Sequence, residues 1–429
     1  MRILLHAYQL SPYRGSEYSV AWNYIMEMGK EHSITVLYGA NGNHMGDLDP
    51  VEDYRKLIGS RDITFVPIPC TPLMTFLNQL NKHNIFVYSF YFAYHLWEKA
   101  AFRKAKQLIR EQQYDLIHFL GPIGYREPGF LWKLPLPYLW GPLGGFDNDP
   151  RVFQYKMPWT GKIKNLFRSL FNTWQQKYSL SVRHAMRRSD NVLAASTSFA
   201  DAIRRNYGLE ACVIPENGII DIASAEFLTS RDFTSDPFNM LWIGTIDYRK
   251  NLKVMLDALL LLPFPKDRWN LTVIGNGPLK AEMQTYAEQK GIADRIRWTG
   301  NIPRNEVLQY FRDAHCHVIS SSREGNPTTI WEAMSHGVPT ITFDHCGMHD
   351  TICDSCGIRV PIPREYSQLT QGLAAAIDKL YSDRALLKKL SYGAIDCAKK
   401  FTFDRRHEFF NQQYQIAIRN YQRKHNVKQ

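Results

Sequence analysis

Two glutamates eight positions apart mark the stretch with the clearest chemical potential. Residues 321 to 341 read SSREGNPTTIWEAMSHGVPTI, so Glu324 lies in a polar loop and Glu332 about one turn into the helix predicted to follow. A carboxylate accepts two hydrogen bonds at once, which suits the vicinal hydroxyls of a sugar. We interpret Glu324 as a candidate ligand of a sugar ring and Glu332 as a candidate ligand of a ribose diol.

Each glutamate also has a purely structural interpretation. Thr329 and Glu332 match the T-x-x-E pattern of a capping box, in which Glu332 would only cap its helix. Glu324 could equally be a solvated loop carboxylate. The spacing alone leaves both alternatives open.

Residues suited to phosphate binding occur in the loops before and around this stretch. Gly244 ends a predicted strand and is followed by Arg249-Lys250, while Gly275-Asn276-Gly277 would let the backbone approach a ligand closely. The helix start at Thr328-Thr329 offers backbone N–H groups to an anion, and Lys250 would neutralise its charge. Together these loops predict a diphosphate site.

Alternating short apolar runs and helical stretches are expected to position these loops. Strand-like runs at 1–8, 33–39, 114–121, 136–141, 191–196 and 211–218 precede a polar, turn-rich segment at 219–237, after which the pattern restarts. The pattern predicts the α/β class, with two doubly wound, Rossmann-like domains. We expect an N-terminal domain at 1–218 completed by a final helix at 404–429, a linker at 219–237, and a C-terminal domain at 238–403.

Ligands of doubly wound sheets bind where the strands end at their carboxyl side. The loops at 244–251, 275–280, 299–303 and 320–328 each follow a predicted strand of the second domain. We therefore expect them to line one rim.

Composition excludes several classes of protein. A chain of 429 residues with 45% hydrophobic residues is long enough for two domains. Its opening, MRILLHAYQLSPYRG, is too quickly polar for a signal peptide, and no apolar run approaches the ~18 residues of a membrane span. Seven scattered cysteines indicate a reducing cytoplasm.

The sequence predicts no metal site. Cys353 and Cys356 lie near His345, Cys346 and His349, which invites comparison with zinc sites. Structural zinc sites favour two well-separated ligand pairs, and no second pair is evident.

One segment is strongly basic. Residues 150–189 contain no Asp or Glu, and apolar residues at helical spacing run through its centre. The segment could be a helix lying on anionic lipid headgroups, or a helix that packs its apolar stripe on a core. Nucleic acid is disfavoured because no nucleic-acid motif accompanies the charge. The nine basic residues are Arg151, Lys156, Lys162, Lys164, Arg168, Lys177, Arg183, Arg187 and Arg188.

The motifs together carry a resemblance to a known family. EGNPTTIWEAMSHGVP resembles the E-x7-E signature of retaining glycosyltransferases of family 4, which have the GT-B fold. Gly244 with Lys250 and Asn251 resembles the donor-diphosphate turn of that family, and VIGNGP and RWTGNIP resemble its next two loops. SPYRGSE, IPENGI and FTFD resemble family segments near the start, before the linker and near the end.

The resemblance implies a specific activity. The C-terminal domain would bind a UDP- or GDP-sugar and the N-terminal domain an acceptor, with anomeric configuration retained and no metal required. Glu324 would contact the donor sugar, Glu332 the ribose, and Lys250 the diphosphate. The remaining donor-side positions are Gly15, Ser16, Gly244, Thr245, Arg249, Gly275, Asn276, Gly277, Thr299, Gly300, Gly325, Asn326, Thr328 and Thr329.

Departures from the family pattern concern both halves of the chain. Thr245 stands where the family often has Arg, so Arg249 would have to substitute. The segment WGPLGGF lacks the histidine that many members carry, and Gly144 and Gly145 would offer backbone groups instead. Two further acceptor-side candidates are Glu17, which could be only a first-turn acid, and His118, which could be only a core histidine.

We therefore expect a retaining hexosyltransferase that extends a lipid-linked or cell-surface glycan at the cytoplasmic face of the plasma membrane. A GT-B nucleotide-sugar epimerase and a non-catalytic GT-B partner subunit stay open as alternatives. A dinucleotide dehydrogenase is weaker, because IGNGPLK lacks the third glycine of G-x-G-x-x-G.

Overall fold

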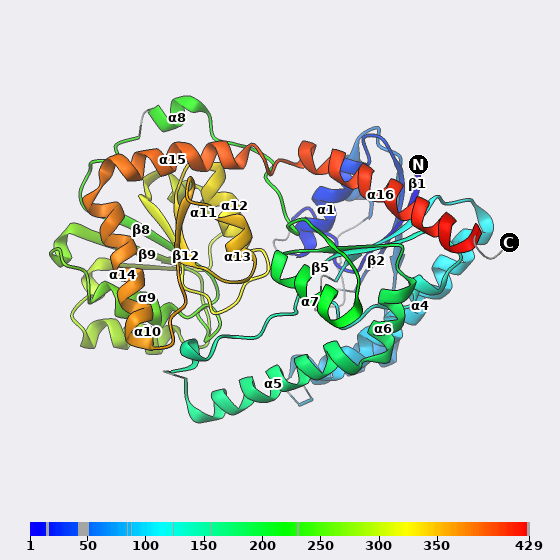
Figure 1. The fold of residues 1–429 in the computed structure, drawn as a ribbon, viewed down its shortest axis with the longest axis horizontal. Helices are drawn as coiled ribbons and strands as arrows, with labels where there is room; N and C mark the ends of the chain where they lie inside the picture. Colours follow the sequence, from blue (N-terminus) through cyan, green and yellow to red (C-terminus); the bar gives the residue numbers. More distant parts are fainter. Residues whose placement is uncertain are drawn as a thin grey trace. The chain divides into compact units, whose positions relative to one another are not determined.

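The computed structural model describes residues 1–13, 17–41, 51–83, 85–86, 88–122, 124–155, 157–229 and 231–426. The chain forms two compact units, each built on one parallel sheet (Figure 1). Unit 1 comprises Met1–Phe146, Thr173–Glu216 and Phe403–Gln429, and unit 2 comprises Asp147–Asn172 and Asn217–Thr402.

Unit 1 contains a seven-stranded sheet with the order β3-β2-β1-β4-β5-β6-β7. Every neighbouring pair is parallel, which requires a crossover between strands and explains the helices that separate them. The strands are β1 (Arg2–Ala7), β2 (Ser33–Gly39), β3 (Ile63–Ile68), β4 (Leu116–Gly121), β5 (Tyr138–Leu143), β6 (Asn191–Ala194) and β7 (Cys212–Val213).

Helices on unit 1 include one from the far end of the chain. The final helix, α16 (Phe403–Asn426), contacts α1, β5 and β6 and contributes Phe410, Tyr414 and Ala417 to the buried core. The other helices here are α1 (Glu17–Met28), α2 (Val51–Ile58), α3 (Pro72–Lys82), α4 (Ser89–Glu111), α6 (Leu180–Arg188) and α7 (Thr197–Tyr207).

Unit 2 contains a six-stranded parallel sheet with the order β10-β9-β8-β11-β12-β13. Its strands are β8 (Phe238–Ile243), β9 (Trp269–Ile274), β10 (Ile296–Gly300), β11 (Cys316–Ile319), β12 (Thr340–Phe343) and β13 (Gly357–Val360). Its helices are α8 (Ala225–Thr229), α9 (Leu252–Leu259), α10 (Lys280–Gln289), α11 (Arg304–Asp313), α12 (Thr328–Ser335), α13 (Cys346–Thr351), α14 (Tyr366–Ser382) and α15 (Arg384–Ala398).

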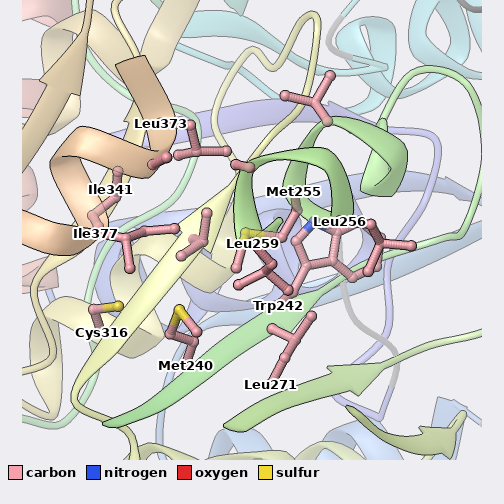
Figure 2. Packing of buried hydrophobic residues seen from close by; sticks show 14 of the residues in the cluster. Met240, Trp242, Met255, Leu256, Leu259, Leu271, Cys316, Ile341, Leu373 and Ile377 are labelled. Carbon is pink, nitrogen blue, oxygen red and sulfur yellow. The ribbon is translucent and has the colours of Figure 1, made fainter. Parts of the chain in front are cut away.

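The core of unit 2 forms where helices α9 and α14 pack on the sheet. Figure 2 shows Trp242 of β8 among Met255, Leu256 and Leu259 of α9, with Leu271 on the neighbouring strand. Strands that are covered on both faces are made mostly of apolar residues. The sequence predicted these strands from runs of that composition. The predicted fold class, α/β with two doubly wound sheets, is confirmed.

The segment 219–237, expected to be a linker, is tied to unit 2. The backbone N–H of Ala223 donates to the carbonyl of Ser335 at 2.8 Å, and the Arg231 guanidinium donates to the carbonyl of Gly337 at 3.0 Å. The buried side chain of Leu228 lies beside Gly337. Short helix α8 lies within this segment.

Helix α5 (Trp159–Tyr178) turns its apolar side chains outward and polar side chains inward. Asn165, Asn172 and Gln176 are buried, whereas Phe167 is 67% exposed. A helix that packs an apolar stripe on a core shows the reverse arrangement, so that interpretation of the basic segment is wrong. The exposed apolar side chains are Trp159, Ile163, Leu166, Phe167, Leu170, Phe171, Trp174 and Tyr178.

Candidate functional site

Four loops from adjacent strands form the candidate site in unit 2. The loops follow β10, β9, β8 and β11, which are consecutive in the sheet and parallel, so their carboxyl ends share one edge. Backbone hydrogen bonds join the loops: Gly275 N–H donates to the Gly300 carbonyl, Ile246 N–H to the Asn276 carbonyl, and Ser322 N–H to the Arg249 carbonyl. The rim expected from the sequence is therefore one connected surface.

Glycine at position 275 is required by this close packing. Its φ of +135° lies in the region that favours glycine, and a Cβ added there would lie 2.0 Å from the carbonyl oxygen of Gly244. The side chain of Lys250 in turn packs over Gly244, where an added Cβ would lie 3.1 Å from Lys250 Cδ. The loop after β8 therefore folds back so that Lys250 passes over the strand end.

Glu324 forms an ion-paired group with both basic residues of the loop after β8. Its Oε1 accepts from Arg249 Nη1 at 2.6 Å and from Lys250 Nζ at 2.8 Å. The Glu324 side chain is 10% exposed and that of Lys250 14%, whereas Arg249 is 38% exposed. Two cations on one buried carboxylate form a locally positive site.

The protonation state of Glu324 follows from opposing effects. Burial alone would raise the pKa of this carboxyl, but the charges of Lys250 and Arg249 and hydrogen bonds from Lys250 and Ser321 hold it below its ordinary value. Glu324 is therefore an anion at neutral pH. It can accept hydrogen bonds but cannot donate a proton.

The start of helix α12 differs from the capping-box alternative. The N-cap is Pro327, no side chain of the described residues caps the helix, and Thr329 is the second helical residue. Glu332 thus lies in the second turn, beyond the position that a capping box uses, so that alternative is wrong. Because the first amides of a helix have no partner within it, those of Thr328 and Thr329 are available to an anion.

Two buried polar atoms beside this helix start lack a hydrogen-bond partner among the described residues. They are Thr329 Oγ1 and Asn326 Nδ2. The other amide atom of Asn326, Oδ1, accepts from Trp331 Nε1, which fixes the orientation of the Asn326 side chain. Buried polar groups are normally satisfied, so these two atoms point to a ligand with acceptor or donor groups.

The smaller loop residues hold the rim in shape. Asn276 Oδ1 accepts from Gly277 N–H at 2.9 Å, and Thr299 Oγ1 donates to the carbonyl of Gly300 at 3.0 Å. Thr245 is exposed at the end of β8. Gly325 lies between Glu324 and Asn326 in the loop before α12.

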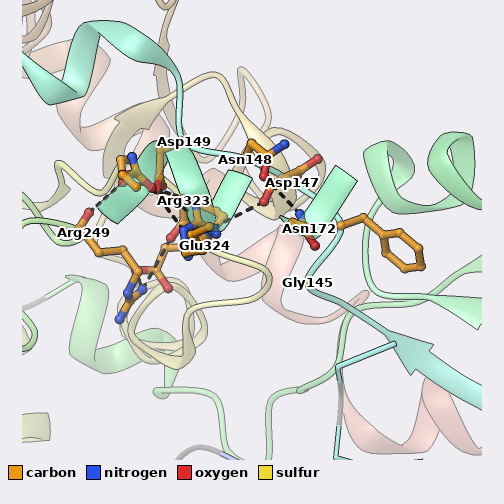
Figure 3. A network of polar contacts seen from close by, with 12 residues as sticks. Gly145, Asp147, Asn148, Asp149, Asn172, Arg249, Arg323 and Glu324 are labelled. Atoms are coloured by element: carbon orange, nitrogen blue, oxygen red, sulfur yellow. Dashed lines mark hydrogen bonds and ion pairs between the residues drawn. The ribbon is translucent and has the colours of Figure 1, made fainter. Parts of the chain in front are cut away.

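A distant segment contacts the Glu324 loop, and the sequence did not reveal it. Asp149, which is labelled in Figure 3, accepts from Ser322 Oγ through Oδ1 at 2.8 Å and from Arg168 of α5 through Oδ2 at 2.7 Å. Arg323 donates to the backbone carbonyl of Asp147 at 3.4 Å. Some 170 positions separate the two segments, and no local pattern connects them.

The candidates of unit 1 are distributed differently. Gly15 and Ser16 lie outside the described residues, and Glu17 begins helix α1. Gly144 forms an isolated bridge with Gly124, and the carbonyl of Gly145 accepts from Arg126 at 3.1 Å.

His118 is a fully buried residue of β4. Its Nε2 lies 2.8 Å from the Gly141 carbonyl and must donate, so its Nδ1 accepts from the Tyr24 hydroxyl at 2.9 Å. Burial lowers its pKa to about 4, although the Gly141 hydrogen bond opposes the shift. These contacts are those of a neutral core histidine.

Comparison with known proteins agrees with this geometry. Residues 226–396, less than half of the chain, match the family described as Glycosyl transferases group 1. The match supports a glycosyltransferase family for this part of the chain, which contains all four rim loops.

Among curated relatives, a lipopolysaccharide 1,6-galactosyltransferase of Salmonella typhimurium is 31% identical over 112 residues, which cover 25% of this chain and 30% of the relative. This chain spans between 30% and 50% of the length of the first curated relatives that it matches.

Solved structures match over nearly the whole chain. The lipopolysaccharide outer core galactosyltransferase WaaB, in its apo form, has a TM-score of 0.63 at 16% identity and covers 96% of this chain and 99% of its own. HepE of Anabaena in complex with UDP and glucose has a TM-score of 0.60 at 16% identity, with 96% and 98% covered. At these identities the likeness establishes the GT-B fold alone.

No helix among the described residues is long and apolar enough to cross a bilayer.

Proposed function

We propose that this protein is a retaining, family 4 glycosyltransferase that moves a hexosyl unit from a UDP- or GDP-sugar to a lipid-linked or cell-surface glycan acceptor. The observation that carries the proposal is the buried carboxylate of Glu324, which pairs with Arg249 and Lys250. It lies at the shared carboxyl edge of parallel strands, just before a helix N-terminus, where nucleotide phosphates bind in doubly wound sheets.

Lys250 has the capacity to bind a diphosphate without releasing Glu324. An ammonium group has three donors, of which the contact with Glu324 uses one. The other two donors, together with the amides of Thr328 and Thr329, would hold the phosphate oxygens. Arg249 would supply the second positive charge that Thr245 cannot.

Glu324 and Glu332 would orient the two sugars of the donor. As an anion, Glu324 would accept hydrogen bonds from hydroxyls of the transferred hexose. Glu332, which lies in the second turn of α12, would accept from the ribose diol.

In the proposed reaction, the bond between the anomeric carbon and the diphosphate oxygen breaks, and the diphosphate takes the electron pair. A bond from the acceptor oxygen to the anomeric carbon forms on the same face, which retains configuration. The acceptor proton passes to the departing diphosphate. Lys250 and the helix N-terminus would stabilise the negative charge that develops on this leaving group.

The acceptor would be held by unit 1 at the inner face of the plasma membrane. Helix α5 supports membrane association because it exposes eight large apolar side chains beside Lys162 and Lys164. A lipid-linked acceptor stays in the bilayer, so an enzyme that uses it must come to the surface. The cell-envelope role also accords with the activity named for the Salmonella relative.

We propose that transfer needs no metal ion, since Lys250 and the α12 terminus supply the positive charge. Turnover should therefore persist in EDTA. Loss of turnover that Mg²⁺ or Mn²⁺ restores would contradict this part of the proposal.

The decisive test is turnover of nucleotide sugars by site variants. A panel of UDP- and GDP-sugars is first incubated with the wild-type chain, and release of UDP or GDP is measured. Glu324→Gln and Lys250→Ala should each reduce turnover by about two to three decades, equivalent to ~2–4 kcal/mol of transition-state stabilisation. Both residues lie in rim loops, so circular dichroism should change little, whereas the melting temperature should fall because each change breaks a buried ion pair.

A matched control is Glu288→Gln, an exposed carboxylate on helix α10 of the same unit. It should retain full turnover. Near-wild-type turnover by folded Glu324→Gln, or the absence of turnover with every nucleotide sugar, would refute the proposed function.

A further inference from the structure

Three cysteines from separate segments of unit 2 converge at one place. Cys353 and Cys356 lie in the turn between α13 and β13, and Cys397 lies in the last turn of α15. The Cys353 sulfur is 3.6 Å from that of Cys356 and 3.5 Å from that of Cys397, and all three sulfurs lie within 4.8 Å of one another. The sequence analysis did not connect Cys397 with the other two cysteines, because Cys397 lies 41 positions beyond Cys356.

The backbone holds this arrangement in place. The carbonyl oxygen of Ser355 packs against Gly393 of α15 so closely that a Cβ added there would lie 1.8 Å from it. Gly393 precedes Cys397 by one helical turn, so the cysteine turn and Cys397 share one face of α15. The Cys356 N–H also donates to the Cys353 carbonyl at 3.0 Å, which closes the turn. The sulfur atoms are therefore brought together by packed backbone.

We propose that Cys353, Cys356 and Cys397 form a binding site for a thiophilic divalent ion of the zinc type, with a fourth coordination position open to solvent. Zinc–sulfur bonds of ~2.3 Å at tetrahedral angles place the sulfurs about 3.8 Å apart. The separations from Cys353, 3.5 and 3.6 Å, differ from this value by only a few tenths of an ångström, and the Cys356 and Cys397 sulfurs lie within 4.8 Å of each other. Soft thiolate ligands select this class of ion.

The burial pattern indicates where the open position lies. Cys356 and Cys397 are buried, whereas Cys353 is exposed. The Ser355 hydroxyl lies 3.0 Å from the Cys353 sulfur and 3.4 Å from the Cys397 sulfur, on the exposed side of the group. Three protein ligands with an accessible fourth position are typical of open rather than closed zinc sites.

Metal binding at this site is coupled to protons. The ion would bind three thiolates and release the protons that these thiols carry, so its affinity should rise with pH.

A second group of possible ligands lies elsewhere in unit 2, and the experiment must separate the two. Asp147, His345 and Cys346 also lie within 4.8 Å of one another. His345 and Cys346, which lie near Cys353 in the sequence, therefore belong to this second group, whereas His349 pairs with Asp344. A single thiol there distinguishes it from the three-cysteine site.

The test is a cobalt titration of the full chain, reduced with a phosphine and freed of metal. We expect one equivalent of Co²⁺ to produce intense thiolate-to-cobalt charge-transfer absorption, and Zn²⁺ to abolish it by displacement. Zn²⁺ should also raise the melting temperature. Cys353→Ser, Cys356→Ser and Cys397→Ser should each weaken binding about tenfold or more.

Two matched controls are Cys346→Ser, which removes the thiol of the second group, and Cys212→Ser, which removes an exposed thiol of unit 1. Both should titrate as the wild type does. Absence of charge-transfer absorption in the reduced wild type, or loss of binding only in Cys346→Ser, would overturn the proposal. Rapid Cys353–Cys356 disulfide formation in air by a chain that binds no Co²⁺ when reduced would also overturn it and identify a redox pair instead.

Discussion

Arg168 donates to the carboxylate of Asp149 across 2.7 Å, and this contact joins helix α5 to the segment beside the Glu324 loop. The other oxygen of Asp149 accepts from Ser322, two residues before Glu324. Arg168 therefore anchors the helix through its polar face, and its charge is directed away from the exposed apolar face.

Loss of this anchor should loosen α5. We expect Arg168→Ala to speed amide hydrogen exchange in the helix and lower the free energy of unfolding of unit 2 by about 1 kcal/mol. This free energy is at the low end for a charge-assisted hydrogen bond, because the Arg168 side chain is one-third exposed and solvent partly screens its charge. Lys164→Ala on the exposed side of the same helix is the matched control. Equal exchange rates in the two variants would show that Arg168 anchors nothing.

Membrane binding should depend on the cations that stay exposed. Lys162→Glu combined with Lys164→Glu should weaken co-sedimentation with anionic vesicles by at least about tenfold, since each basic residue near such a surface contributes ~1 kcal/mol. Binding by the wild type should fall as salt is raised, because the Debye length is only ~8 Å at physiological ionic strength. Release of UDP or GDP in solution should be unchanged.

Lys388→Glu with Lys389→Glu reverses two exposed charges on α15 and serves as the control. It should bind vesicles as the wild type does. If the α5 variant also co-sediments fully, the helix is not the membrane contact, and a soluble or extended glycan becomes the better acceptor.

Glu332 should affect nucleotide binding more than stability. Glu332→Gln keeps the shape of the side chain but removes its charge, so UDP or GDP should bind about tenfold more weakly, equivalent to ~1.4 kcal/mol for a hydrogen bond to a charged group. The melting temperature should barely move, because Glu332 does not cap α12. Calorimetric titration of the wild type and Glu332→Gln with UDP and with GDP measures the two affinities, and Glu288→Gln serves as the control. Unchanged affinity would remove Glu332 from the donor site.

His118 should remain neutral across the physiological pH range. Burial lowers its pKa to about 4 in the folded chain, against about 6.5 when unfolded, so the unfolded state binds the proton first as pH falls. Its contribution to stability is complete above about pH 6.5 and is lost progressively down to about pH 4, a total of roughly 3 kcal/mol. The buried His315 and His317, with pKa values lowered to about 4 and about 3, act in the same direction.

Nuclear magnetic resonance of the histidine rings measures this directly. The His118 ring should keep the shift of the neutral form from pH 8 to about pH 5, and the chain unfolded in denaturant provides the reference near pH 6.5. A His118 ring that titrates above pH 6 in the folded protein would contradict the assignment of a buried, neutral histidine.

Local patterns in the sequence determined the fold class and much of the candidate rim. Strands such as β2 at Ser33–Gly39 and β8 at Phe238–Ile243 are predominantly apolar, and strands buried on both faces typically have that composition. Glycines and polar residues directly after β8, β9 and β11 indicated the loops, because parallel strands bring their carboxyl ends to one edge. Glu324 and Lys250 could thus be singled out before their contact was known.

Only the tertiary structure decided which of these groups meet and which side of a helix is covered. The apolar stripe of α5 is visible in the sequence, but its exposure depends on contacts made by the polar face of the helix. On that face Arg168 pairs with Asp149, and Asn172 pairs with Asn148. The second cation on Glu324 and the meeting of Cys397 with Cys353 likewise depend on chain segments far apart in sequence. The periodicity of a sequence indicates which residues share one face of a helix or strand. Contacts between elements depend instead on how distant segments pack, and the spacing of residues within one element does not determine that packing.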